Sequence, residues 1–175
     1  HLKQILENTI FSFGNILAIY LLGTAMGAWL FQRHYHKKMD KAPVLLLGGL
    51  ATSVLYTSVL LSYAREILQF FSPDSTAYLG HLRAELLLAM VVFLLPTIFM
   101  GALFSYLIAK MKPAEVGLAY GMNTAGAVFA PFLFGLIFIP QIGGQLALVV
   151  CWVAYVLLLL WGVKTLNWPG RPLSL

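Results

Sequence analysis

Long apolar runs separated by short polar links dominate the chain. Each run approaches the roughly 20 apolar residues that an α-helix needs to cross the hydrocarbon core of a bilayer. Charged and proline-bearing breaks divide the chain into five expected spans, over residues 10–31, 43–63, 84–109, 118–140 and 145–163. The predicted fold is therefore an all-α, polytopic membrane helical bundle. It forms a single transmembrane domain over residues 1–175, without a soluble catalytic domain.

The links supply the expected helix breaks. "QRHYHKKMDKA" follows the first run, and "SPDSTAYLGHLR" separates the second run from the third. "KMKPAEVG" leads into the fourth run, and "PQIGG" ends it. Pro43 opens the second run, where the first turn of a helix tolerates proline.

Composition supports the membrane class. Apolar residues make up 61% of the chain and charged residues only 10%, with a mean hydropathy of +0.87. So few polar residues cannot cover the surface of a soluble domain.

Basic residues gather in the links on one side of the predicted membrane, and short loops rich in Lys and Arg stay on the cytoplasmic side. Eight of the eleven basic residues share that side: Arg33, Lys37, Lys38, Lys41, Lys110, Lys112, Lys164 and Arg171. This bias predicts a cytoplasmic C-terminus. Because an odd number of spans follows His1, we expect one further helix upstream, which gives six spans.

The fourth run is rich in residues that weaken an isolated helix. Small residues recur along it, at Gly117, Gly121, Ala125, Gly126 and Ala130, and the first run carries Gly23 and Gly27. Stripes of small residues let helix backbones approach closely in lipid. We expect the fourth run to be buried, with Gly121 close to Gly23 or Gly27. Replacing Gly121 by leucine is then expected to destabilise the bundle by about 1 to 3 kcal/mol.

Two other residues of the fourth run carry separate expectations. Pro131 removes one backbone donor and is expected to kink the helix. Asn123 is costly against lipid, so we expect it to point inward. It serves either as a structural hydrogen-bonding group worth on the order of 1 kcal/mol or, with Thr124, as a contact to a ligand.

A short pattern recurs in the first and fourth runs, as "GTAMGAWLF" and "NTAGAVFAPF". With a sixth span upstream, these runs would be the second and fifth helices. Those positions are equivalent in two three-helix units of inverted topology, as in many transporters.

Three segments carry a resemblance to a known family. "FSFGNILAIYLLGTAMGAWLFQR", "LLPTIFMGALFSYL" and "VGLAYGMNTAGAVFAPFLFGLIFIPQIG" resemble the second, fourth and fifth spans of the fused major-facilitator-like and spermidine synthase membrane proteins of bacteria. The resemblance covers about residues 10–163 and implies a major-facilitator-like half in the bacterial cytoplasmic (inner) membrane. Ser105 stands where the family usually has proline, and Pro131 where it usually has a small residue. The family's aminopropyltransferase domain has no counterpart in this sequence.

Other candidate chemistry is sparse. Short ion pairs are expected at the outer ends of the second and third spans, from Arg65, Glu66, Arg83 and Glu85. His34 and His36 lack the further ligands that a metal site needs, so we expect no metal, no cofactor and no catalytic residue. The net charge of +5 follows membrane topology, which favours lipid headgroups over nucleic acid as partners.

Two hypotheses for function remain. The first is a non-catalytic membrane subunit or anchoring module that joins other membrane protein subunits. The second is a small-molecule, polyamine-like transporter or half-transporter. Against the second, acidic residues occur only at the ends of the predicted spans, whereas a carrier of a polyamine cation is expected to bury a carboxylate.

Overall fold

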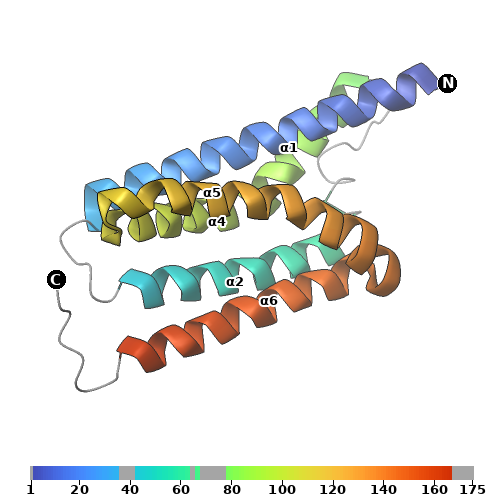
Figure 1. Ribbon diagram of the computed structural model, residues 1–175. Coiled ribbons are helices and arrows are strands. Elements are labelled where there is room, and N and C mark those ends of the chain that lie inside the picture. Colours follow the sequence, from blue (N-terminus) through green and yellow to red (C-terminus); the bar gives the residue numbers. More distant parts are fainter. Residues whose placement is uncertain (1, 36–41, 64–65, 68–77, 167–175) are drawn as a thin grey trace.

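The computed structural model is almost entirely helical over the residues that it describes, which are 2–35, 42–63, 66–67 and 78–166 (Figure 1). The long helices are α1 (Leu2–Leu30), α2 (Ala42–Ser62), α4 (Tyr78–Lys110), α5 (Pro113–Ala130) and α6 (Ile139–Leu166). Two π-helical segments extend them, η1 (Phe31–Tyr35) after α1 and η2 (Pro131–Phe138) between α5 and α6.

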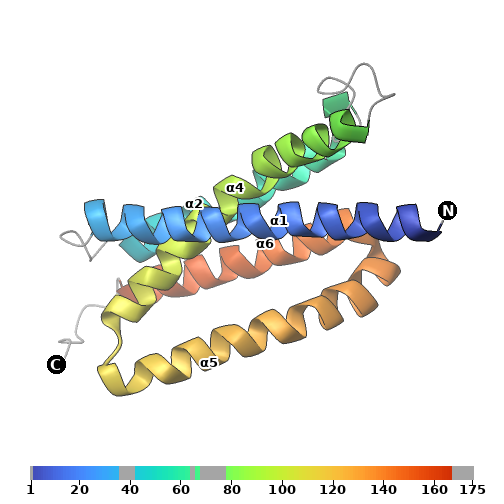
Figure 2. The same ribbon diagram turned by 90° about the horizontal axis from the view of Figure 1, so that it is seen from above.

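Four helical stretches are long and apolar enough to cross a membrane: Phe13–Arg33, Ala42–Ser62, Leu86–Lys110 and Pro113–Lys164. The membrane class expected from the hydropathy pattern is therefore supported. The fourth stretch has 52 residues and contains both of the last two predicted spans. It folds back on itself, so that α5 and α6 run in opposite directions (Figure 2).

The helices alternate in direction. Helices α1, α4 and α6 run one way, and α2 and α5 run the other way (Figures 1 and 2). Helix α1 packs on α4, α4 on α2, and α2 on α6. The C-terminal ends of α1, α4 and α6 therefore lie together at one end of the bundle. We call it the basic end, because Arg33, Lys110, Lys112 and Lys164 lie there.

The best-buried part of the interior lies among α1, η1, α2 and α4. One cluster joins Phe31, Ala42, Leu46 and Ala102, with Phe99, Leu103 and Tyr106 packed against it. The rings of Phe31 and Tyr106 meet edge to face, with centroids 6.0 Å apart. Such a pair adds about 0.5–1.5 kcal/mol to the burial of its surface. Three helical elements are thereby joined near the basic end.

Two helix starts differ from the sequence-based expectation. Helix α4 begins at Tyr78 and not near residue 84, so half of the polar link is helical. Helix α5 begins at Pro113 and not near residue 118. Proline pre-sets the dihedral of a first helical turn. The Glu115 carboxylate accepts a hydrogen bond from the Lys112 backbone N–H at 3.4 Å, which satisfies a donor at this helix start.

The sequence predicts that the helix breaks at "PQIGG". The break does occur in this segment, but at a glycine and not at the proline. The helix continues through Pro140, and the backbone leaves helical geometry at Gly143, with φ +79° and ψ 162°. A residue with a Cβ rarely adopts a positive φ. Glycine at position 143 therefore permits the chain reversal between α5 and α6.

The reversal can be tested by replacing Gly143 with alanine. The variant should lose about 1–2 kcal/mol of stability because its Cβ disfavours positive φ. The measurement is the unfolding free energy of the purified chain in mixed detergent micelles. Gly144→Ala is the matched control, since a Cβ has open space at both positions and only Gly143 has positive φ. Equal effects of the two substitutions would contradict the assignment.

Candidate functional site

Glycines of α1 contact α4 at the point where the two helices cross (Figure 2). A Cβ added at Gly23 would collide with the side chain of Thr97. A Cβ added at Gly27 would collide with the carbonyl group of Ile98. The two helices therefore approach to a separation that only glycine allows at these positions.

The contact is reciprocal, because α4 also contributes a glycine. A Cβ added at Gly101 would lie only 2.6 Å from the Cα of Thr24 on α1. We call the contact formed by Gly23, Gly27 and Gly101 the glycine crossing. The small-residue spacing of the first span does mark a close helix contact. Its partner is α4, and the predicted proximity of Gly23 or Gly27 to Gly121 is wrong: no described atom outside α5 lies within 4 Å of a Cβ added at Gly121.

Alanine substitution distinguishes the glycines of α1 that pack against α4 from the exposed glycines of α5. Gly27→Ala should destabilise the purified chain by about 1 to 3 kcal/mol, because the α4 backbone must move away. Gly121→Ala should be neutral or stabilising by up to about 1 kcal/mol, since alanine favours the helix. Detergent unfolding of both variants gives the comparison. A neutral Gly27→Ala would show that the two helices do not pack this closely.

The contact between α2 and α4 depends on a proline inside α4. Pro96 has no N–H, so the carbonyl of Val92 lacks its usual donor four residues later. Thr57 of α2 supplies the missing donor: its hydroxyl donates to the Val92 carbonyl oxygen at 2.9 Å. Both residues are buried, Val92 with 1% of its surface exposed and Thr57 with 4%. In lipid no water can replace this hydrogen bond.

Sequence reasoning missed this pair, although a signal existed. A proline within an apolar span always frees the carbonyl four residues earlier, and a hydroxyl on another span is a usual donor. Thr57 was not distinguishable from Thr52 by sequence. Thr52 bonds only to the carbonyls of Gly48 and Gly49 in its own helix.

A double-mutant cycle tests the pairing. Thr57→Val should destabilise the wild-type chain by about 1 kcal/mol. In the Pro96→Ala background the effect should be much smaller, because the substituted alanine restores the N–H that the Val92 carbonyl needs. Thr52→Val is the control and should behave alike in both backgrounds. Additive effects of Thr57→Val and Pro96→Ala would contradict the pairing.

Helix α6 is attached to α2 by a further polar contact. The Gln145 amide nitrogen donates to the Ser62 hydroxyl at 3.1 Å. The Ser62 hydroxyl in turn donates to the Ser58 carbonyl at 3.0 Å. This contact joins the last turn of α2 to the first turns after the Gly143 reversal. It lies at the end of the bundle opposite the basic end.

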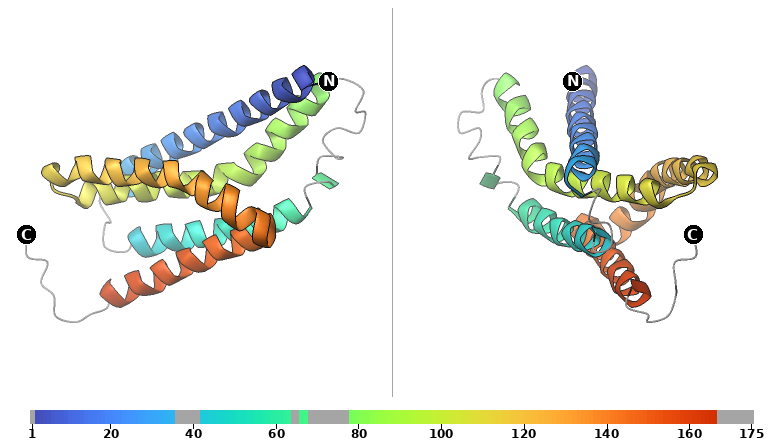
Figure 3. Two further views of the ribbon diagram at one scale, coloured as in Figure 1. Left: turned by 45° about the vertical axis from the view of Figure 1, so that its right-hand side comes forward. Right: turned by 90° about the vertical axis from the view of Figure 1, so that its left-hand side faces the viewer.

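Helix α5 and segment η2, which we call the α5–η2 arm (Pro113–Phe138), diverge from the rest of the bundle (Figures 2 and 3). None of its residues is buried. Tyr120 makes an edge-to-face contact with Phe104 of α4, at 5.2 Å between centroids. The prediction that this span is buried among the other helices is therefore wrong for the described chain.

The predicted inward orientation of Asn123 is also wrong within this chain. Its side chain is exposed and makes no hydrogen bond to any residue that the structure describes. Asn123 and Gly121 are two residues apart, which at about 100° per residue places them on nearly opposite sides of the helix. One neighbouring helix cannot contact both. Gly126 and Ala130 lie on the Asn123 side, so small residues occupy two sides of α5.

The other predicted residues of the arm are equally exposed. The Thr124 hydroxyl donates to the Tyr120 carbonyl at 2.9 Å within the same helix, and a Cβ added at Gly126 has open space. At Pro131 the α-helix gives way to π-helical hydrogen bonding. The predicted kink at Pro131 stays a prediction, and the change in hydrogen bonding is explained because proline cannot donate in the α-helical pattern.

The candidate ion pairs lie mostly outside what can be described. Arg65 is not among the described residues, and nothing is described of the Glu85 side chain. Glu66 and Arg83 are both exposed, and their expected partners are Arg65 and Glu85 respectively, so both expected pairs stay predictions. His36 also lies outside the described residues. Among the described residues there is no group of three metal-ligating side chains.

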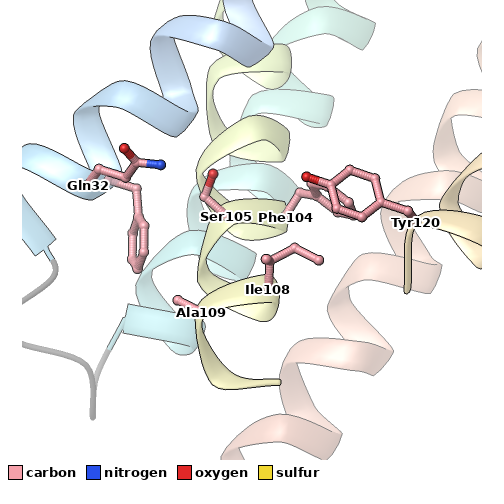
Figure 4. A pocket seen from close by; sticks show the side chains of 7 residues that line it. Gln32, Phe104, Ser105, Ile108, Ala109 and Tyr120 are labelled. Atoms are coloured by element: carbon pink, nitrogen blue, oxygen red, sulfur yellow. The ribbon is translucent and has the colours of Figure 1, made fainter. Parts of the chain in front are cut away.

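A pocket of about 480 Å³ opens near the basic end, between η1, α4 and α5 (Figure 4). Polar and apolar side chains line it: Phe31, Gln32, Phe104, Ser105, Ile108, Ala109 and Tyr120. Sequence reasoning noted Ser105 only as a departure from a family pattern. The seven residues come from three distant stretches, so no local motif marks the pocket.

Comparisons with known proteins found no matching family model, no matching curated protein and no matching solved structure.

Proposed function

We propose that this chain is a non-catalytic integral membrane module that joins a larger membrane assembly through its α5–η2 arm. In this proposal the Pro113–Lys164 stretch crosses the membrane twice, with the reversal at Gly143 between its two spans. The chain then has five spans and a cytoplasmic C-terminus. The gathering of Arg33, Lys110, Lys112 and Lys164 at one end supports this orientation.

The observation that carries the proposal is the exposure of Asn123. Asn123 lies about 15 Å along α5 from Pro113, near the middle of a hydrocarbon core about 30 Å thick. An amide at this depth needs a hydrogen-bond partner, and no described residue of the chain supplies one. The apolar side chains of the arm suit lipid, but this amide does not.

The position of Asn123 also indicates where the partner packs. Val116 and Ala119 lie on the same side of α5 and are partly covered. Tyr120, next to Ala119, contacts Phe104 of α4, and α5 then diverges from α4 (Figure 2). We infer that a transmembrane helix of a partner subunit packs there. Its matching chemistry is a small-residue face with a hydrogen-bonding side chain at the depth of Asn123.

The alternative is a polyamine-like transporter or half-transporter. The opposite directions of α1 and α5 agree with an inverted repeat (Figure 2). The four candidate spans, however, contain only one carboxylate, Glu115, which lies in the first turn of α5 and hydrogen-bonds the Lys112 backbone. A polyamine cation would thus lack a charged partner at membrane depth. The resemblance to the spermidine-synthase-related membrane proteins of the bacterial inner membrane is compatible with either proposal.

Photo-crosslinking in intact membranes tests the module proposal. A photoreactive side chain at Ala130, on the Asn123 side of the arm, should give one discrete protein adduct, and Asn123→Leu should reduce its yield several-fold. A photoreactive side chain at Leu157 of α6, which is also exposed, is the matched control and should react mainly with lipid.

Two outcomes would contradict the module proposal. One is lipid adducts alone at both positions. The other is a chain that purifies alone and moves a labelled polyamine across liposomes in a way that Asn123→Ala abolishes. The second outcome would establish the carrier.

A further inference from the structure

The pocket near the basic end lies at the depth of a membrane interface. Gln32 is next to Arg33, where one candidate span ends, and Ala109 is next to Lys110, where another ends. Tyr120 is about two turns inside the start of the fourth candidate span. At this depth lipid headgroups give way to acyl chains.

Three polar side chains converge in the pocket. The Gln32 amide, the Ser105 hydroxyl and the Tyr120 hydroxyl point toward one another across it (Figure 4). None of these side chains hydrogen-bonds another residue that the structure describes. They can therefore donate hydrogen bonds to a ligand, and Phe104 and Ile108 provide an apolar wall beside them. This arrangement suits an amphiphile.

The surroundings of the pocket are positively charged. Arg33 follows Gln32 in η1, and its guanidinium lies over the ring of Trp29, 5.1 Å from the centroid. Lys110 and Lys112 follow the α4 wall of the pocket, and both are exposed. The nearby acid, Glu115, accepts a hydrogen bond from the Lys112 backbone N–H. An anionic ligand is favoured by this balance of charge.

We propose that this pocket binds an anionic phospholipid from the leaflet at the basic end. Its phosphate accepts hydrogen bonds from Gln32, Ser105 and Tyr120, and the nearby cations add electrostatic attraction. The first part of an acyl chain lies along Phe104 and Ile108. A volume of about 480 Å³ is within the usual range of small-molecule sites, and it accommodates a headgroup with its first methylene groups. Tyr120 belongs to the α5–η2 arm, whereas the other six lining residues lie on η1 and α4.

Lipid binding to the purified chain in nanodiscs tests this proposal. Nanodiscs containing phosphatidylglycerol in phosphatidylcholine are compared with phosphatidylcholine alone, by native mass spectrometry of retained lipid and by thermal unfolding. Phosphatidylglycerol should be retained selectively and should raise the unfolding temperature. Lys110→Gln together with Lys112→Gln should weaken retention, by about fivefold for each cation removed.

Pocket variants and a distant cation provide the controls. Ser105→Phe, which fills the pocket, and Gln32→Leu, which removes a donor, should each reduce retention several-fold. Their unfolding temperature in phosphatidylcholine alone reports whether the fold survives. Lys164→Gln removes a cation from the basic end outside the pocket and should leave retention unchanged.

Three results would overturn the site. One is equal retention of the two lipids by the wild-type chain. Another is equal loss of phosphatidylglycerol in Lys164→Gln and in the pocket variants. The third is full displacement of the lipid by water-soluble glycerol 3-phosphate at matched concentration, which would show that the pocket takes a free phosphate ester and that the acyl wall contributes nothing.

Discussion

In a lipid environment every backbone polar group needs a protein partner, and this bundle depends on meeting that requirement where Pro96 interrupts the hydrogen bonding of α4. Pro96 leaves the Val92 carbonyl without its intrahelical donor, and Thr57 replaces that donor from a neighbouring helix. The proline in α4 thus creates the need for a specific hydrogen bond between α4 and α2. Because the bond requires one hydroxyl to meet one carbonyl, it sets the register of α2 against α4 as well as their separation.

The glycine crossing acts on the opposite side of the same helix. Association in lipid gains little from hydrophobicity, so close backbone contact must supply much of the attraction. Gly23 and Gly27 on α1 and Gly101 on α4 allow that contact. Helix α4 is therefore held on one side by van der Waals packing and on the other by a hydrogen bond. This makes α4 the central helix of the described bundle.

The α5–η2 arm carries the same kinds of packing and hydrogen-bonding residues as the other helices, but its glycines and Asn123 have no partner in another described helix. It has small residues on two sides and an amide near its middle, yet no residue of the arm is buried. Glycine favours close helix packing only where a second backbone is available, and an amide gains in lipid only where a partner group faces it. The features that hold α1, α2 and α4 together are unmatched on the arm, which is why we assign its contacts to another polypeptide.

The sequence by itself determined the helical membrane class, the approximate ends of the apolar spans and the gathering of basic residues at one end. These properties depend on hydropathy, helix geometry and charge, which act over short stretches of chain. Which glycine stripe meets which helix was not determined, since Gly27 and Gly121 lie in similar local surroundings. Only the tertiary structure placed Gly27 against α4, paired Thr57 with Val92 and brought Gln32, Ser105 and Tyr120 to one pocket. Each of these contacts joins residues far apart in the chain, and the crossing of whole helices decides them.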